Sequence, residues 1–490
     1  MTAATPDSFD LLEATVADVH AAMEAGEVTA EALVERYLDR IDRYDDELNA
    51  VLTLNSSARE RARDLDRRHE ADGPVGPLHG VPTLVKDNHD TADMATSAGC
   101  TALADSRPPR DAFVVDRLRD AGAVILGKTN LQELSFGVDT ISSLGGETRN
   151  AYSRSHRPSG SSGGTAVAVA ANLATLGTGS DTCSSVRSPP AFNACVGVRP
   201  TRGLLSRTGV IPLSETQDTA GPITRTVADA ALLFDVLQGP HSDDPLCLPD
   251  DGTDYREATR GSVEGLSVAY SLDLGVFPVD ERVRTVVDDA LDAFADAGMD
   301  VSRVDVDFGR SREEICEWWL RAVEVKYAAT ADVLAAEHGV DYTGADRGDV
   351  TPEFAAAIER GEAYGAKEYV AANRVRTDVF RGFERVFEDH DLLVAPTLAV
   401  PPVANAEDGN TLGPSEVDGE SVNPLIGWCL TYPFNMSGHP VANVPAGLDG
   451  DGLPVGMQVA GRRFADGTVL AASAAVERVR PWDGFYPPRA

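Results

Sequence analysis

Residues 158–187 read PSGSSGGTAVAVAANLATLGTGSDTCSSVR, with small residues crowded at both ends. The stretch opens with a serine and glycine loop, residues 159–164, and closes with a second small-residue turn, residues 177–185. Between them, the apolar run 165–176 predicts a buried helix. Serine and glycine at this density favour backbone amides gathered around something small. A flexible linker is the alternative, but a linker has no reason to contain so apolar a segment.

Strand-like and helix-like patterns alternate through the rest of the chain. Helices are expected after Thr15 and after Thr29, both of which are good N-caps, and a third, charged helix is expected to end near Gly73. The apolar run that ends at Val85 and the run 391–397 predict buried strands. No repeat period and no convincing linker divides the sequence. The pattern predicts an α/β fold around one mixed or parallel sheet.

The charge of the chain is strongly negative, at −35 for 490 residues. Direct binding of nucleic acid is not expected, because phosphate contacts need basic patches. Only four of the 43 basic residues are lysine. An acidic, lysine-poor surface is typical of proteins that work in concentrated salt, where screening removes self-repulsion. An acidic protein from an ordinary salt environment is the alternative.

Cysteine and histidine spacing gives no support for a disulfide framework or a metal site. The six cysteines lack CxxC spacing, and the nine histidines form no HxxxH or HxxH pair. The N-terminal residues lack a basic segment followed by an apolar one, and no apolar run reaches the length of a membrane span. We therefore expect a cytoplasmic protein with no membrane partner and no metal site.

Residues 122–129, GAVILGKT, match the phosphate-binding pattern GxxxxGK[ST]. The pattern binds phosphate only where its middle residues form a loop whose amides face the ligand. Here those middle residues are Ala-Val-Ile-Leu, which predict the core of a strand. Nucleotide binding is therefore not expected.

Lys86 follows the buried strand that ends at Val85. By itself this position favours a structural lysine that snorkels to the surface or pairs with Asp87. A serine nucleophile, however, needs a base within hydrogen-bond reach, and no histidine lies within the stretch 158–187. A lysine can serve if burial leaves its amine neutral. The residues alone allow a Ser/Lys hydrolase and go no further.

Seven ordered motifs make the chain resemble the amidase signature family over nearly its whole length. They are GVPTLVKDN (80–88), GKTNLQEL (127–134), PSGSSGG (158–164), GSDTCSSVR (179–187), VRPTRG (198–203), QDTAGPITR (217–225) and NMSGHPVANVPAG (435–447). The resemblance implies a large mixed β-sheet core flanked on both faces by α-helices, with an N-terminal helical layer. It implies one domain over residues 1–490, with four parts: the helical layer 1–75, the signature catalytic core 76–240, a helical substrate-side insert 241–390, and the C-terminal part of the core 391–490.

The family's catalytic roles map onto three residues of this chain. The resemblance implies that Ser185 is the nucleophile, that Ser161 is a bridging serine behind a cis Gly160–Ser161 peptide bond, and that Lys86 is the base. A cis bond before a residue other than proline costs about 3 kcal/mol, so its surroundings must enforce it.

The resemblance also implies the groups around the triad. Backbone amides just before and at the nucleophile would form the oxyanion hole, and four further residues would support the site. The implied oxyanion residues are Thr182, Cys183, Ser184 and Ser185 itself, and the implied supporting residues are Ser162, Ser180, Asp181 and Arg187.

The sequence departs from the family pattern at two points. Cys183 and Ser184 replace a common Gly-Gly, and Ser159 replaces the first glycine of the loop. The amides remain, but the added side chains restrict the turn and are expected to affect the substrate range. Cys183 also becomes a rival nucleophile, although Ser185 holds the family's position.

The resemblance implies an amidase that hydrolyses a carboxylic amide to an acid and ammonia or an amine, with no metal or cofactor. The expected partner is a small-molecule amide, and a homodimer is left open. The glutaminase subunit of glutamyl-tRNA(Gln) amidotransferase is the alternative function. A catalytically silent scaffold protein ranks last, because all three triad residues are present. The region from Cys316 to Tyr327 and Trp428 are candidates for the acyl pocket, with core packing as the alternative.

Overall fold

One mixed sheet of eleven strands runs through the computed structural model, which describes residues 9–211, 216–250 and 252–487. In spatial order the strands are β1 (Val51–Leu54), β3 (Val124–Thr129), β2 (Pro82–Lys86), β6 (Leu176–Asp181), β8 (Thr219–Thr224), β7 (Val196–Arg199), β14 (Val441–Leu448), β15 (Pro454–Gly461), β11 (Leu392–Pro396), β9 (Ser267–Tyr270) and β10 (Asp300–Arg303). Two small hairpins, β4 (Ile141–Ser142) with β5 (Gly146–Glu147) and β12 (Glu416–Val417) with β13 (Glu420–Ser421), lie outside it.

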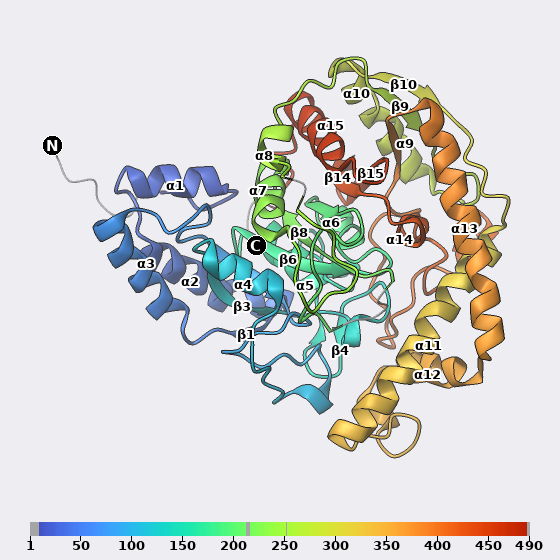
Figure 1. The fold of residues 1–490 in the computed structure, drawn as a ribbon, viewed down its shortest axis with the longest axis horizontal. Helices are drawn as coiled ribbons and strands as arrows, with labels where there is room; N and C mark the ends of the chain where they lie inside the picture. Colours follow the sequence, from blue (N-terminus) through green and yellow to red (C-terminus); the bar gives the residue numbers. More distant parts are fainter. Residues whose placement is uncertain (1–8, 212–215, 251, 488–490) are drawn as a thin grey trace.

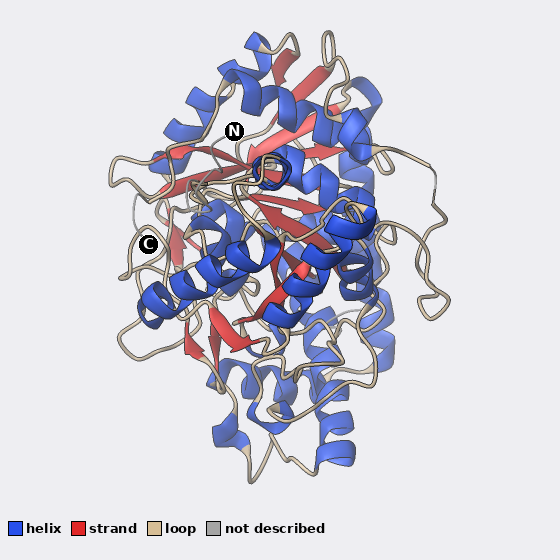
Figure 2. Cartoon of the chain, turned by 90° about the vertical axis from the view of Figure 1, so that its left-hand side faces the viewer, coloured by secondary structure: helices blue, strands red, loops and turns tan. Residues whose placement is uncertain are grey.

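Helices cover both faces of this sheet, as Figure 2 shows in blue against the red strands. They are α1 (Val16–Glu24), α2 (Ala30–Leu48), α3 (Ala58–Asp72), α4 (Phe113–Asp120), α5 (Gly163–Ala170), α6 (Ser188–Phe192), α7 (Val227–Leu237), α8 (Tyr255–Ala258), α9 (Glu281–Ala290), α10 (Asp292–Asp296), α11 (Arg312–His338), α12 (Pro352–Ala363), α13 (Ala366–Asp389), α14 (Tyr432–Ser437) and α15 (Asp466–Val479). Short 3-10 turns cover Thr101–Leu103, Glu133–Ser135 and Arg347–Asp349. Figure 1 places α1, α2 and α3 at one end of the molecule and the long helices α11, α12 and α13 at the other.

The predicted α/β class, with a large mixed sheet flanked by helices and an N-terminal helical layer, is confirmed. The caps of the first two helices form as expected. Thr15 makes a complete capping box with Asp18, and the Thr29 side chain accepts a hydrogen bond from the amide of Ala32. No helix within the described parts of the chain is long and apolar enough to cross a bilayer.

The first strand, β1, was not predicted from the sequence. It pairs antiparallel with β3 at the edge of the sheet. Its four residues are half-buried or exposed, so they lack the apolar pattern of a core strand. Pairing with a neighbour, which a local pattern does not contain, decides its conformation.

The predicted helix 165–176 is wrong in its second half, and the predicted turn 177–185 is wrong in its first half. Helix α5 ends at Ala170, Asn172 adopts a left-handed φ of 57°, and residues 176–181 form the buried strand β6. Glycine suggested a turn, but here it permits close packing. A Cβ atom at Gly177 would lie 2.5 Å from Thr165 Cγ2.

The sheet topology brings two chain segments together at one edge. Strand β2 pairs in parallel with β6. The carboxyl ends of parallel neighbours meet at the same edge of a sheet. Lys86, the last residue of β2, therefore lies near the end of β6, where its amine reaches Ser180.

Candidate active site

Three side chains that are distant in sequence are linked by two consecutive hydrogen bonds. Lys86 Nζ lies 2.7 Å from Ser161 Oγ, and Ser161 Oγ lies 3.0 Å from Ser185 Oγ. Their exposed fractions are 0% for Lys86, 1% for Ser161 and 4% for Ser185. The structure thus places the three residues that the resemblance implied within direct hydrogen-bond reach of one another.

Each of the three comes from a different kind of element. Lys86 ends β2, Ser185 lies in the turn between β6 and α6, and Ser161 lies in the loop before α5. The peptide bond between Gly160 and Ser161 is cis. A Cβ atom at residue 160 would lie 1.5 Å from the carbonyl oxygen of Asp139, so only glycine fits there.

Hydrogen bonds to backbone carbonyls hold the Ser161 loop on three sides. The amide of Gln132 donates to the carbonyl of Ser161 at 3.1 Å. The hydroxyl of Thr140 donates to the carbonyl of Ser159 at 2.8 Å, and the hydroxyl of Ser188 donates to the carbonyl of Gly160 at 3.3 Å. Ser159 adopts a φ of 62°, a conformation that glycine reaches more easily than other residues. This is the position at which Ser159 replaces the first glycine of the loop pattern.

The Lys86 amine has no carboxylate in direct contact among the described residues. Its second contact is Ser180 Oγ, at 3.0 Å, and Asn88 Nδ2 donates to the same oxygen at 2.9 Å. Burial lowers the pKa of Lys86 to about 7, although Asp181 and Asp218 act to raise it. The amine is therefore partly neutral near pH 7 and becomes more so as the pH rises.

The alternative for Lys86, a structural lysine that snorkels to the surface or pairs with Asp87, is wrong. The side chain of Lys86 is fully buried and does not snorkel to the surface. Asp87 instead pairs with Lys128, whose Nζ lies 3.1 Å from Asp87 Oδ1. Lys128 belongs to the sequence that matches the phosphate-binding pattern, residues 122–129. Six of these residues form strand β3, and the middle of the motif is therefore strand and not a loop.

A buried ion pair organises the turn that carries Ser185. Asp181 accepts hydrogen bonds from Arg187 Nε at 3.0 Å, from the Val186 amide at 3.1 Å and from Asn435 Nδ2 at 2.7 Å. Burial acts to raise the pKa of Asp181, but Arg187, Arg199 and Asn435 together hold that pKa below its usual range. Arg187 Nη2 also donates to the carbonyl of Cys183 at 3.0 Å, so the turn wraps around the pair.

This arrangement predicts a large stability loss for Arg187→Met. The substitution keeps the stem but leaves the Asp181 carboxylate buried without its main partner, and breaking a buried pair costs about 3–5 kcal/mol. Urea unfolding followed by circular dichroism measures the loss. The matched control is Arg59→Met at the exposed Arg59–Glu35 pair, expected to cost less than about 1 kcal/mol. Equal losses in the two variants would show that the buried pair does not organise the turn.

The backbone amides of residues 182–185 have no hydrogen-bond acceptor within the described parts of the chain. Side chains around the turn are nevertheless tied down. The Thr182 hydroxyl donates to Asp218 in a very short bond, and the Ser188 hydroxyl donates to Ser184 Oγ at 2.7 Å. Ser162, the N-cap of α5, lies 3.4 Å from the Ser180 carbonyl.

Several contacts in the site were not foreseen from the sequence. Asn88, Asp218 and Asn435 lie within the family motifs, but nothing local in their spacing indicated which groups they would contact. His89 lies three residues after Lys86 and is fully buried, with Nδ1 3.1 Å from Thr178 Oγ1. Burial lowers the pKa of His89 well below its usual value, and Lys86 and Lys128 lower it further.

The aromatic side chains among the acyl-pocket candidates are buried, and one of them contacts the turn. Trp319 Nε1 lies 3.5 Å from the Thr182 carbonyl. Tyr327 instead donates to the carbonyl of Leu134, and Trp428 stacks on Phe192, which are packing contacts. Among the side chains that the structure describes, no group of three or more His, Cys, Asp or Glu residues is arranged to hold a metal ion.

Comparison with known proteins finds relatives over nearly the whole chain. The family model described as Amidase matches residues 32–470. An acylamidase from Rhodococcus erythropolis is 35% identical over 480 residues, covering 98% of this chain and 97% of the relative. A glutamyl-tRNA(Gln) amidotransferase subunit from Exiguobacterium sibiricum is 33% identical, covering 96% of this chain and 98% of the relative.

A solved structure extends the similarity to three dimensions. The crystal structure of a bacterial aryl acylamidase of the amidase signature enzymes superposes with a TM-score of 0.92 at 35% identity. The alignment covers 96% of this chain and 97% of that chain. The chain therefore belongs to the amidase signature family of hydrolases.

Proposed function

We propose that this protein hydrolyses the C–N bond of a linear carboxylic amide through an acyl-enzyme on Ser185. The observation that carries the proposal is the unbroken contact from Lys86 Nζ through Ser161 Oγ to Ser185 Oγ. A serine hydroxyl needs a base to become a nucleophile, and the buried amine of Lys86 has the pKa to act as one near neutral pH.

In the proposed cycle, protons move along this contact in both directions. As Ser185 Oγ attacks the carbonyl carbon, its proton passes to Ser161 Oγ, and the proton of Ser161 passes to neutral Lys86. The relay then returns a proton to the departing nitrogen, the C–N bond breaks, and an ester on Ser185 remains. Water attacks this ester through the same relay, which releases the acid and restores the Ser185 hydroxyl.

The free amides of residues 182–185 are the proposed oxyanion hole. Amides held in place before the reaction stabilise the negative charge that develops on the carbonyl oxygen. Removal of one such donor typically costs about 10²- to 10³-fold in kcat. The Asp181–Arg187 pair and the Thr182–Asp218 contact support the idea, because they hold the turn from outside and leave its amides unoccupied.

The function is tested by assaying the purified protein against aliphatic, aryl and amino-acid amides. We expect release of acid and amine for at least one class, with no added metal or cofactor. The assay is run in low and high KCl, because the composition also leads us to propose a salt-adapted, cytoplasmic protein. Activity that is highest in low salt would contradict the salt adaptation alone, and failure to hydrolyse any amide would contradict the function.

Cys183 is not the proposed nucleophile, and Cys183→Ala is expected to retain activity within about tenfold. Burial raises the pKa of Cys183 well above its usual value, and Asp181 raises it further. The thiol therefore stays protonated and unreactive. Steady-state kinetics on the best amide measures the effect. A loss as large as that of Ser185→Ala would instead assign the nucleophile to Cys183.

A second candidate function is the glutaminase subunit of a glutamyl-tRNA(Gln) amidotransferase. Relatives named as a subunit of that amidotransferase match along the same length of chain, at 33% identity for the one from Exiguobacterium sibiricum. A stable, stoichiometric partner recovered with the protein, together with glutaminase activity only in that complex, would favour this candidate. Amide hydrolysis by the isolated chain favours the stand-alone amidase.

A further inference from the structure

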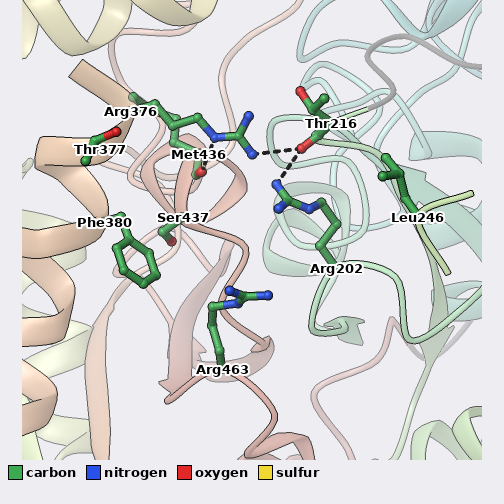
Figure 3. Close-up of a pocket in the computed structure, with 9 residues that line it drawn as sticks. All are labelled: Arg202, Thr216, Leu246, Arg376, Thr377, Phe380, Met436, Ser437 and Arg463. Carbon is green, nitrogen blue, oxygen red and sulfur yellow. Dashed lines mark hydrogen bonds between the residues drawn. The ribbon is translucent and has the colours of Figure 1, made fainter. Parts of the chain in front are cut away.

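A pocket lined by three arginines lies apart from the candidate catalytic residues. Its volume is about 370 Å³, and Arg202, Arg376 and Arg463 contribute to its wall together with Thr216, Phe380 and Met436. The arginines come from three separate segments, and in Figure 3 their guanidinium groups converge on one space. None of Lys86, Ser161 and Ser185 lines it.

Two of the guanidinium groups are held in place by backbone carbonyls. Arg202 Nη1 donates to the Thr216 carbonyl at 2.7 Å, and Arg376 Nη2 donates to the same oxygen at 3.0 Å. Arg376 Nε donates to the Met436 carbonyl at 2.8 Å. These bonds use only part of each guanidinium, which carries five N–H donors.

Arg463 is the least satisfied of the three. Its Nε is buried without a hydrogen-bond partner, and its guanidinium stacks over Phe464 at 4.8 Å from the ring centroid. Within the described part of the chain, no acceptor takes a hydrogen bond from it. A buried donor without a partner is costly, so a group that satisfies it would stabilise the protein.

The absence of acidic partners is unexpected for this composition. The chain has 78 acidic and 43 basic residues, yet no carboxylate among the described residues pairs with any of the three arginines. The guanidinium groups repel one another instead. Burial, and next the charge of Arg202, lower the pKa of Arg376 to about 10.

We propose that this pocket binds a small organic anion that carries a carboxylate or a phosphate group. Both groups match the planar guanidinium fork and accept paired hydrogen bonds. Such a ligand would offset the repulsion among the arginines and give Arg463 an acceptor. The apolar surfaces of Phe380 and Met436 leave room for a carbon skeleton, and the volume exceeds that of a single ion. The proposal does not rest on the hydrolase function.

Thermal unfolding of the intact protein tests this site, with KCl adjusted to keep ionic strength constant. Inorganic phosphate and succinate are titrated separately, so that the anion that saturates at lower concentration identifies the preferred group. We expect a saturable rise in Tm for wild type and at least a tenfold weaker response for Arg463→Gln. Without added anion, Arg463→Gln is expected to melt no lower than wild type, because it removes one repelling charge.

Two control variants show whether the response comes from this pocket. Arg59→Gln removes an exposed, paired arginine, and Ser185→Ala removes the proposed nucleophile; both should respond like wild type. Isothermal titration of the wild-type protein with the same anions keeps the test valid if Arg463→Gln does not fold. No saturable response to either anion, or an equal response in Arg463→Gln, would overturn the proposal.

Discussion

Ser185→Ala is expected to lower kcat/KM on the best amide substrate by roughly 10⁶-fold, the size of the kcat loss seen when a serine nucleophile is removed. The hydroxyl lost is the one that would form the acyl-enzyme, and no other group takes its place. Ser161 Oγ, which lies 3.0 Å from Ser185 Oγ, would then have no hydroxyl from which to accept a proton. Initial rates measured by release of the amine give the ratio.

The control for this variant is Ser184→Ala, one residue away in the same turn. The Ser184 hydroxyl contacts Ser188 and takes no part in the relay, and alanine keeps the backbone amide. We expect Ser184→Ala to lose far less activity than Ser185→Ala. Comparable losses would mean that the turn depends on its hydroxyls for shape and would leave Ser185 without support as the nucleophile.

Lys86→Met is expected to lower kcat/KM by about 10²- to 10⁴-fold, the usual contribution of a positioned general base. Methionine keeps much of the buried stem and avoids a large cavity. Lys86→Arg should be as inactive, because a guanidinium keeps its proton and cannot act as a base. Steady-state kinetics on the two variants gives both values. Activity retained by Lys86→Arg would show that the site needs positive charge and not a neutral amine.

The pH dependence of the wild-type enzyme follows from the same amine. Burial lowers the pKa of Lys86 to about 7, and the neutral form is the base. The kcat/KM should therefore rise with pH, level off above about 7 and fall about tenfold for each pH unit below it. His89 and Cys183 have pKa values well below and well above this range, so neither accounts for the rise. The rise should be absent from the residual activity of Lys86→Met.

Much of the fold was predictable because core strands and amphipathic helices leave local patterns. The strand before Lys86 and helices α1 and α2 follow from apolar spacing and caps. Strand β6 was not predicted, because its glycines suggested a turn. In the structure they allow the strand to pack closely against α5. Strand β1 was also missed, because pairing at the sheet edge decides it and burial does not.

The candidate site was only partly accessible from the sequence. The residues allowed a Ser/Lys hydrolase, and resemblance to a family supplied the three positions. Their contacts span 75 and 24 residues of chain, so no local pattern shows them. The supporting contacts of Asn88, Asp218 and Asn435 depend on tertiary packing in the same way. The arginine pocket gave no signal in the sequence at all, because its three arginines come from separate segments.

The rate at which a fluorophosphonate labels the protein, followed by mass spectrometry across a range of pH, tests the relay most directly. We expect one adduct, on Ser185, with a labelling rate that rises with pH to a plateau and has its midpoint near the pKa of about 7 given for Lys86. In Lys86→Met the same adduct should form far more slowly and without that midpoint. An adduct on Cys183, or a Ser185 labelling rate that Lys86→Met leaves unchanged, would contradict the relay.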